Sequence, residues 1–231
     1  MARRIVSISV DTSTTFRFGK WFFIGVDRMK LIGVTGDCLT NDELLKNLQQ
    51  AEPYLDAVIL REKSKTDEQL TDLIIRLKDR NFPLAKLIIH ARPSLASMLS
   101  VPRVQLTGYG LSVTDAQRDY PNISFGCSVH SLHEALQMEQ NGADWLLYGH
   151  VYETASKPGL PPRGTKELFE IASACTIPVY AIGGIHPHHL TDLQRHHVAG
   201  AALLSPMRSS DALRSYRTAV EKGEIANEED H

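Results

Sequence analysis

The chain has 231 residues, of which 42% are hydrophobic and 23% are charged, and its formal net charge is −2. This length is sufficient for one large α/β domain, and the composition is that of an ordinary globular protein. The charge excludes the basic surface typical of nucleic-acid binding, so an anionic ligand must be bound by a local group of residues. No apolar run approaches the roughly 18 residues of a membrane-spanning helix, so we expect neither a nucleic-acid nor a membrane partner.

The cysteine and histidine patterns predict neither a disulfide framework nor a metal site. Cys38, Cys127 and Cys175 are few, widely spaced and odd in number. Three histidines crowd the segment 186–189, but Pro187 begins a helix there and no i, i+4 pair of histidines is present. Free cysteines fit a reducing compartment, and we predict a cytoplasmic location.

Residues 1–29 are basic and rich in Ser and Thr, with a short apolar patch at 21–26. A signal peptide is disfavoured because the patch is short and no small-residue cleavage site follows it. We interpret the segment as an extension outside the main domain, and a targeting arm is the alternative.

Beyond this extension, short apolar runs alternate with helical patterns. The runs have the composition of buried parallel strands and cover residues 31–36, 56–62, 86–91, 103–108, 124–129, 144–150, 178–184 and 200–205. Helical spacing of apolar residues occurs at 41–50, 66–80, 131–143, 165–174 and 186–197, and is weakest at 111–120. Eight strands are more than a flavodoxin-like sheet usually contains, and no GxGxxG motif follows the first strand. We therefore predict an α/β fold, a (β/α)8 TIM barrel over residues 30–220, with a solvated tail at 221–231.

In such a barrel the chemistry lies on the loops that follow the strands. Two glycines, Gly183 and Gly184, follow the seventh strand, and Ser205 ends the eighth, two residues before Met207. Glycine lets backbone N–H groups approach a phosphate closely, and the amino terminus of a following helix adds a favourable dipole. We predict a phosphate held by the N–H groups of these four residues, with Pro206 unable to contribute. A simple tight turn at the glycines is the alternative.

Four segments occur in the order in which a known family has them. They are LREKS (60–64), GCSVHSLHEA (126–135), DWLLYGHVYET (144–154) with Lys157, and AIGGIHP (181–187). They resemble the thiamine phosphate synthase superfamily and, within it, the thiazole tautomerase (TenI-type) branch. The resemblance covers residues 30–220 and implies a (β/α)8 barrel that binds a small phosphorylated thiazole.

The two branches differ in their need for a metal. A thiamine phosphate synthase holds a pyrimidine diphosphate with Mg²⁺, and the family has one carboxylate after strand three and another after strand four, as a hard cation requires. The corresponding stretches here, 90–96 and 106–112, contain no acidic residue, and His90 replaces the more usual amide. The resemblance therefore favours a tautomerase, which needs no cofactor. A synthase-like transferase and a non-catalytic ligand-binding or regulatory barrel are the alternatives.

The resemblance to tautomerases implies the aromatisation of a thiazole phosphate carboxylate. A proton leaves the sp³ ring carbon that carries the carboxylate, and another is added to the exocyclic carbon. His130 matches the catalytic histidine of the family, and an imidazole, with a free pKa of about 6.5, can act as base and then as acid. Without the resemblance, an ordinary histidine at a helix start is an equal interpretation.

The remaining candidates lie on the same predicted rim. Arg61 and Lys63 are expected to meet a phosphate or carboxylate, and a surface salt bridge is the alternative. Lys157 lies on the Gly- and Pro-rich loop 152–164, which we expect to be a mobile cover, although a solvated lysine fits as well. His150 is a candidate for assisting proton transfer, but a satisfied core or rim histidine is preferred. Further candidates are Thr35, Gln105 and Ser128. The sequence leaves a homodimer open.

Overall fold

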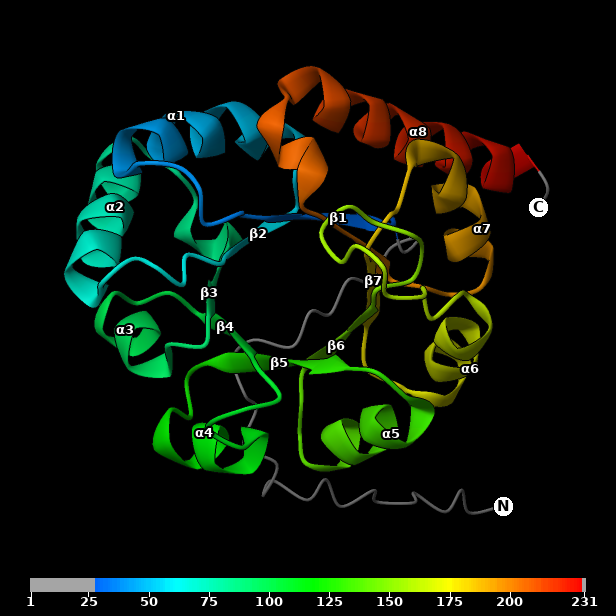
Figure 1. Cartoon of the computed structure of the whole chain (residues 1–231), viewed down its shortest axis with the longest axis horizontal. Helices are drawn as coiled ribbons and strands as arrows, with labels where there is room; N and C mark the ends of the chain where they lie inside the picture. Colours follow the sequence, from blue (N-terminus) through cyan, green and yellow to red (C-terminus); the bar gives the residue numbers. More distant parts are fainter. Residues whose placement is uncertain (1–27, 230–231) are drawn as a thin grey trace, which may run out of the picture.

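The computed structural model describes residues 28–229, with side chains described through residue 223. Eight parallel strands follow one another in sequence order and close through the pairing of β1 with β8, which confirms the predicted barrel. Figure 1 shows the ring of strands with the helices around it. The strands are β1 Lys30–Val34, β2 Ala57–Leu60, β3 Leu87–His90, β4 Arg103–Leu106, β5 Ser124–Val129, β6 Trp145–Gly149, β7 Val179–Ile182 and β8 Gly200–Leu203.

Each strand is followed by a helix on the outside of the barrel. The α-helices are α1 Asn41–Ala51, α2 Asp67–Asp79, α3 Pro93–Met98, α4 Val113–Asp119, α5 Leu132–Gln140, α6 Lys166–Ala174, α7 Leu190–Arg195 and α8 Ser210–Glu229. Short 3₁₀ helices are η1 Glu52–Tyr54, η2 Leu84–Lys86, η3 Pro187–His189 and η4 Ser205–Arg208. Helix α3 was not predicted from the sequence, because its six residues are too few to show helical periodicity. Helix α8 includes residues 221–229 of the segment that was predicted as a tail.

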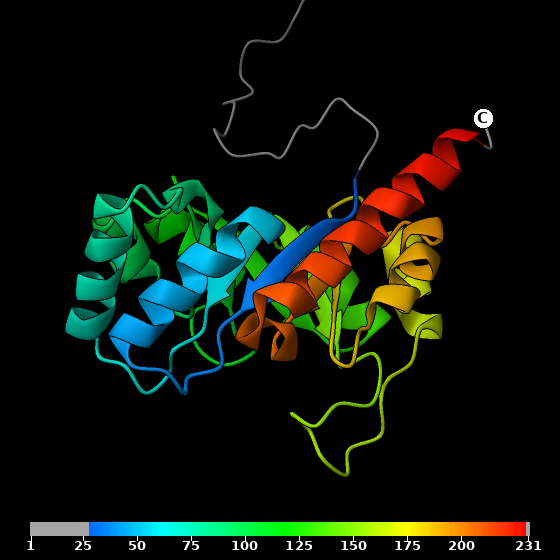
Figure 2. The same cartoon turned by 90° about the horizontal axis from the view of Figure 1, so that it is seen from above.

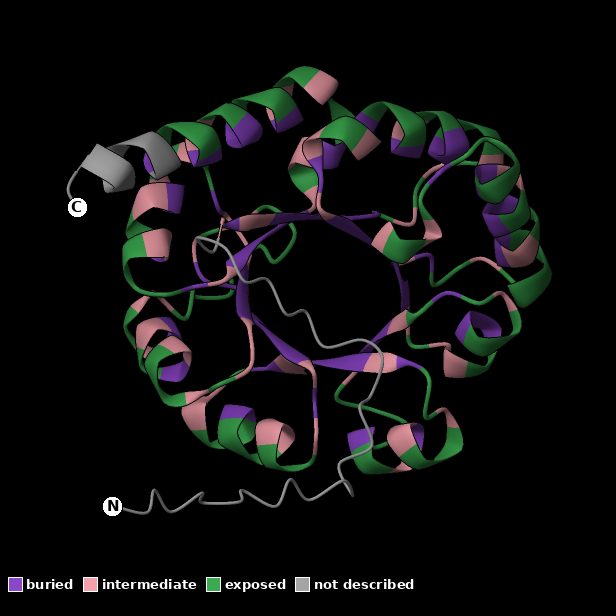
Figure 3. Cartoon of the chain, turned by 180° about the vertical axis from the view of Figure 1, so that it is seen from behind, coloured by how far each residue is buried: buried purple, intermediate pink, exposed green. Residues whose placement is uncertain are grey.

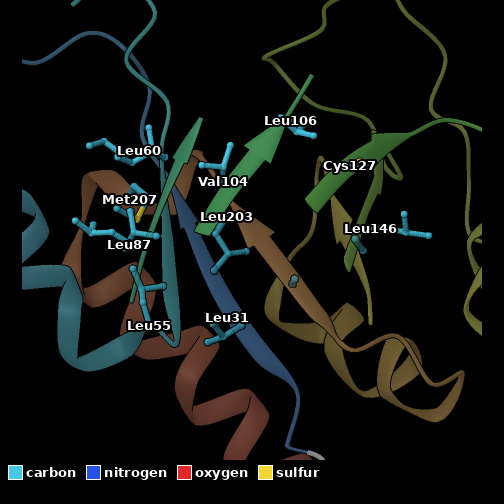
Figure 4. Packing of buried hydrophobic residues seen from close by; sticks show 14 of the residues in the cluster. Leu31, Leu55, Leu60, Leu87, Val104, Leu106, Cys127, Leu146, Leu203 and Met207 are labelled. Atoms are coloured by element: carbon cyan, nitrogen blue, oxygen red, sulfur yellow. The ribbon is translucent and has the colours of Figure 1, made fainter. Parts of the chain in front are cut away.

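Successive residues of each strand face opposite sides of the barrel wall, which gives the protein two apolar layers. Residues such as Leu31, Leu60 and Leu146 point outward and pack under the helices, as Figure 4 shows. The alternate residues, among them Ile59 and Trp145, form a second cluster inside the barrel. In Figure 3 the buried residues accordingly line the strands and the inward sides of the helices.

The same alternation decides which polar side chains reach the interior. Ile59 and Ile88 belong to the interior cluster, so Arg61 and His90, two residues further along β2 and β3, have interior parity at the carboxyl ends. Trp145 pairs in register with Gly126 of β5, so Ser128 also has interior parity. The fold therefore directs polar residues from several strands to one end of the barrel.

The last helix is tied to the first strands through one ion pair. Arg217 of α8 donates from Nη2 to the Asp56 carboxylate at 2.9 Å and to the Tyr54 carbonyl at 2.8 Å. The same carboxylate accepts the N–H of Leu31 at 2.8 Å, so it joins β1, β2 and α8. Among the described residues, no helix is both long enough and apolar enough to cross a bilayer.

Candidate active site

The predicted site residues lie at or directly after the carboxyl ends of the strands. They are Thr35 after β1, Arg61 and Lys63 after β2, Gln105 in β4, Ser128 and His130 at β5, His150 after β6, Gly183 and Gly184 after β7, and Ser205 and Met207 in η4. Figure 2 shows the long β6–α6 loop, residues 150–165, projecting from the end at which β1 finishes. Lys157 is exposed on this loop.

His130 has a defined ring orientation. Its Nδ1 lies 2.9 Å from the carbonyl oxygen of Gly149, the last residue of β6. A carbonyl oxygen only accepts, so the neutral ring carries its proton on Nδ1 and keeps a lone pair on Nε2. The residue as a whole is exposed. This arrangement leaves Nε2 as the atom that can take up a proton.

The main chain around His130 is fixed by two carboxylates. The His130 N–H donates to Glu134 Oε2 at 2.7 Å, and the Leu132 N–H donates to Glu167 Oε1 at 3.1 Å. The other oxygen of Glu167 accepts the Tyr148 hydroxyl at 2.9 Å. Burial, and next the hydrogen bond to Glu167, raise the pKa of Tyr148 well above its ordinary value, so this hydroxyl stays a donor at neutral pH. The start of α5 is therefore held in place independently of the His130 ring.

Inside the barrel, a directed chain of hydrogen bonds links β6, β4 and β5. Trp145 Nε1 donates to Gln105 Oε1 at 2.9 Å, and Gln105 Nε2 donates to Ser128 Oγ at 3.2 Å. Because an indole N–H can only donate, the amide oxygen of Gln105 must face Trp145 and its NH₂ group must face Ser128. Ser128 Oγ accepts in this chain, which leaves its own proton for another acceptor.

A cationic group occupies the ends of β2 and β3. It consists of Arg61, Lys63 and Arg92, and His90 lies beside them. Burial, and next the charges of the three cations, lower the pKa of His90 from its ordinary value to about 4, so His90 is neutral at neutral pH. Arg92 is held by a 2.8 Å ion pair with Asp67. The group concentrates positive charge at the mouth.

His90 is expected to make the fold acid-sensitive. An unfolded histidine binds a proton near pH 6.5, whereas folded His90 binds one only near pH 4. The unfolded state therefore holds more protons between these values, and stability is lost as the pH falls through this window. When the pH is lowered from 7.5 to 4.5, the melting temperature of His90→Asn should fall less than that of the parent. His133→Asn, on the exposed side of α5, is the matched control. Equal slopes for His90→Asn and the parent would contradict the assignment.

The glycine turn after β7 is required by backbone conformation and by close packing. Gly183 and Gly184 have φ values of 101° and 65°. A Cβ on Gly184 would lie 2.2 Å from the carbonyl oxygen of Glu153, so the β6–α6 loop starts directly against this turn. The two glycines therefore make a tight turn, and this geometry is compatible with anion binding.

The four predicted phosphate donors differ in availability. Within the described part of the chain, the N–H groups of Gly184 and Ser205 donate to no backbone acceptor. In contrast, the Met207 N–H donates to the Leu204 carbonyl at 3.2 Å, and the Met207 side chain is buried. Gly184 and Ser205 are thus better placed than Met207 to meet an anion.

Two other candidates have structural partners. The Thr35 hydroxyl is buried and accepts the Arg61 N–H at 2.8 Å, so it positions the first residue after β2. His150 is buried, with Nε2 3.3 Å from the Leu160 carbonyl, a contact that is compatible with a satisfied core or rim histidine. Arg163 was not predicted as a site residue, but its side chain contacts the carbonyl groups of both Gly149 and His130. Its place at the end of the Gly- and Pro-rich loop was the only available signal.

The fold and this polar end define a (β/α)8 barrel with a candidate site for a small anionic ligand. Residues 31–207 match the thiamine monophosphate synthase family, and the chain belongs to this family of thiamine-biosynthesis enzymes. It is 31% identical to the thiamine-phosphate synthase of Pyrococcus abyssi over 189 residues, which cover 80% of this chain and 90% of the relative. It is also 31% identical to the thiamine-phosphate synthase of Chloroflexus aurantiacus over 153 residues, 65% and 71% of the two chains.

Solved structures agree with this membership. The thiamine phosphate pyrophosphorylase of Pyrococcus furiosus superposes with a TM-score of 0.73 at 26% identity, covering 85% of this chain and 98% of the other. A 3-hexulose-6-phosphate synthase superposes with a TM-score of 0.64 at 17% identity, covering 83% and 99% of the two chains. The second similarity shows the shared barrel fold alone.

Proposed function

We propose that the protein is a thiazole tautomerase of thiamine biosynthesis that aromatises a thiazole phosphate carboxylate. The observation that carries the proposal is the 2.9 Å contact between His130 Nδ1 and the Gly149 carbonyl, which leaves Nε2 free as a base at the mouth of the barrel. Acid–base catalysis of this kind needs one group that removes a proton and then returns it, and a neutral imidazole meets that need.

His130 alone is sufficient to remove and return the proton in this reaction. His130 Nε2 removes the proton from the sp³ ring carbon that carries the carboxylate, and the electrons of that C–H bond enter the ring system. The imidazolium then returns a proton to the exocyclic carbon, which leaves an aromatic thiazole of unchanged composition. Both nitrogens of the imidazolium only donate, so the Nδ1–H bond to Gly149 persists through both steps.

The anionic groups of the substrate have complementary partners around His130. The N–H groups of Gly184 and Ser205 suit the phosphate, because free backbone donors beside a short helix bind such groups. The Ser128 hydroxyl and the Arg61 guanidinium suit the carboxylate as donors. Lys157, on the neighbouring loop, is proposed to approach the phosphate when the loop covers the mouth.

A thiamine-phosphate synthase is the second candidate, because the curated relatives carry that name. The donor set here does not fit the Mg²⁺ that such an enzyme uses. The end of β3 presents His90 and the loop after it Arg92, whereas the loop after β4 presents Thr107 and Tyr109. Magnesium prefers carboxylate oxygens, which none of these residues offers. The cations that depress the pKa of His90 would also repel a divalent cation. Among the described residues, no three His, Cys, Asp or Glu side chains are grouped to hold a metal ion.

One NMR experiment separates these functions. The unaromatised thiazole phosphate carboxylate is followed in deuterated buffer with and without the protein. A tautomerase should speed aromatisation above the spontaneous rate and place deuterium on the exocyclic carbon. A parallel sample contains the aromatic thiazole phosphate, a pyrimidine diphosphate and Mg²⁺. Pyrophosphate release there would support a synthase, and inactivity in both samples would support a non-catalytic binding barrel.

A further inference from the structure

Arg163 joins three segments at the mouth of the barrel. Its Nε donates to the Gly149 carbonyl at 3.2 Å, and its Nη1 donates to the His130 carbonyl at 3.0 Å. Its own backbone N–H donates to the His150 carbonyl at 3.0 Å. One residue of the β6–α6 loop therefore spans the ends of β5 and β6, which are neighbours in the barrel (Figure 1).

The Gly149 carbonyl is consequently shared by two donors. It lies 2.9 Å from His130 Nδ1 and 3.2 Å from Arg163 Nε. A carbonyl oxygen has two lone pairs, so it can accept from both at once. A guanidinium is always protonated and has no acceptor, so it offers the imidazole ring no alternative partner.

The carboxylates near His130 do not orient its ring. Glu134 accepts the backbone N–H of His130, and Glu167 accepts that of Leu132, so both fix the main chain. The ring of His130 is held through the Gly149 carbonyl, and Arg163 is the charged side chain that holds this carbonyl.

We propose that Arg163 is a positioning residue that fixes the Nδ1–H tautomer and the ring orientation of His130. The catalytic consequence rests on the proposed function, since it requires that His130 moves the proton. Arg163 also links this alignment to the β6–α6 loop, on which Lys157 lies. The position of this loop and the orientation of the His130 ring therefore depend on the same set of hydrogen bonds.

The test uses the full chain labelled with ¹⁵N-histidine. Long-range ¹H–¹⁵N NMR distinguishes a protonated ring nitrogen from an unprotonated one. In the neutral form of the ring, the parent should carry the proton of His130 on Nδ1, and Arg163→Gln should show a mixture of the two tautomers. In the tautomerase assay, kcat of Arg163→Gln should fall about tenfold to hundredfold, as for a misaligned catalytic group, with KM within about threefold of the parent.

Two further variants make the result specific. Arg163→Lys keeps the charge and one donor, and it should give an intermediate kcat and a largely parental tautomer. Arg208→Gln removes an exposed cation after β8 and is the control for loss of charge. Because Arg163 is exposed, its variants should melt at the parental temperature.

Specific outcomes would overturn the inference. A parental ring spectrum in folded Arg163→Gln would exclude the positioning role. An equal loss of kcat in Arg208→Gln would assign the effect to general charge. If the parent proves inactive as a tautomerase, the proposed function fails, whereas the NMR comparison still decides whether Arg163 sets the ring tautomer.

Discussion

His130→Asn is expected to slow aromatisation of the thiazole phosphate carboxylate by about 10²–10⁴-fold, the usual contribution of general acid–base catalysis. The amide of asparagine can keep a hydrogen bond to the Gly149 carbonyl, but it cannot take up and return a proton near neutral pH. The phosphate donors at Gly184 and Ser205 are separate from this ring, so the affinity for the substrate should stay close to that of the parent.

The measurement is a single-turnover comparison in which the spontaneous reaction is subtracted. His150→Asn serves as the matched histidine variant, because His150 lies one residue beyond β6 and is buried against the Leu160 carbonyl. This variant should slow aromatisation less than His130→Asn does. If His130→Asn keeps a near-parental rate, another group or bulk solvent moves the proton, and a binding barrel becomes the better account of this protein.

Gly126→Ala is expected to lower the free energy of unfolding by about 2–6 kcal/mol. The added Cβ would lie 1.9 Å from Nε1 of Trp145, so the indole must move inside a packed barrel, which costs about 1–3 kcal/mol. Moving the indole also breaks its hydrogen bond to Gln105, a buried residue, and a buried acceptor without a partner costs about 1–3 kcal/mol more.

Urea unfolding followed by circular dichroism measures this loss. Gly108→Ala is the matched control, because Gly108 follows the neighbouring strand β4 and a Cβ there meets nothing within 4 Å. Its unfolding free energy should stay within about 0.5 kcal/mol of the parent, as for an ordinary surface change. An equally small effect of Gly126→Ala would show that the interior accommodates the methyl group and that the Trp145 position is not fixed as described.

The sequence alone was sufficient to predict the barrel and the end of it that carries the polar residues. Both depend on local order: apolar runs alternate with helical patterns, and in a parallel barrel every strand ends on the same side. Position after a strand therefore placed Arg61, Ser128 and His130 together without any knowledge of contacts. Helix α3 escaped prediction because six residues carry little periodic signal.

Only the tertiary structure decided how the candidate site residues are oriented and which groups they contact. The ring of His130 is oriented by a carbonyl 19 residues away, and its own carbonyl is held by Arg163, 33 residues away. The Trp145–Gln105 hydrogen bond spans 40 residues, and the low pKa of His90 comes from burial beside cations on two loops. Such contacts join strands that lie close together in the barrel but are distant in sequence. Ring tautomers and pKa values depend on the partners and burial of each group, which exist only once the barrel has closed.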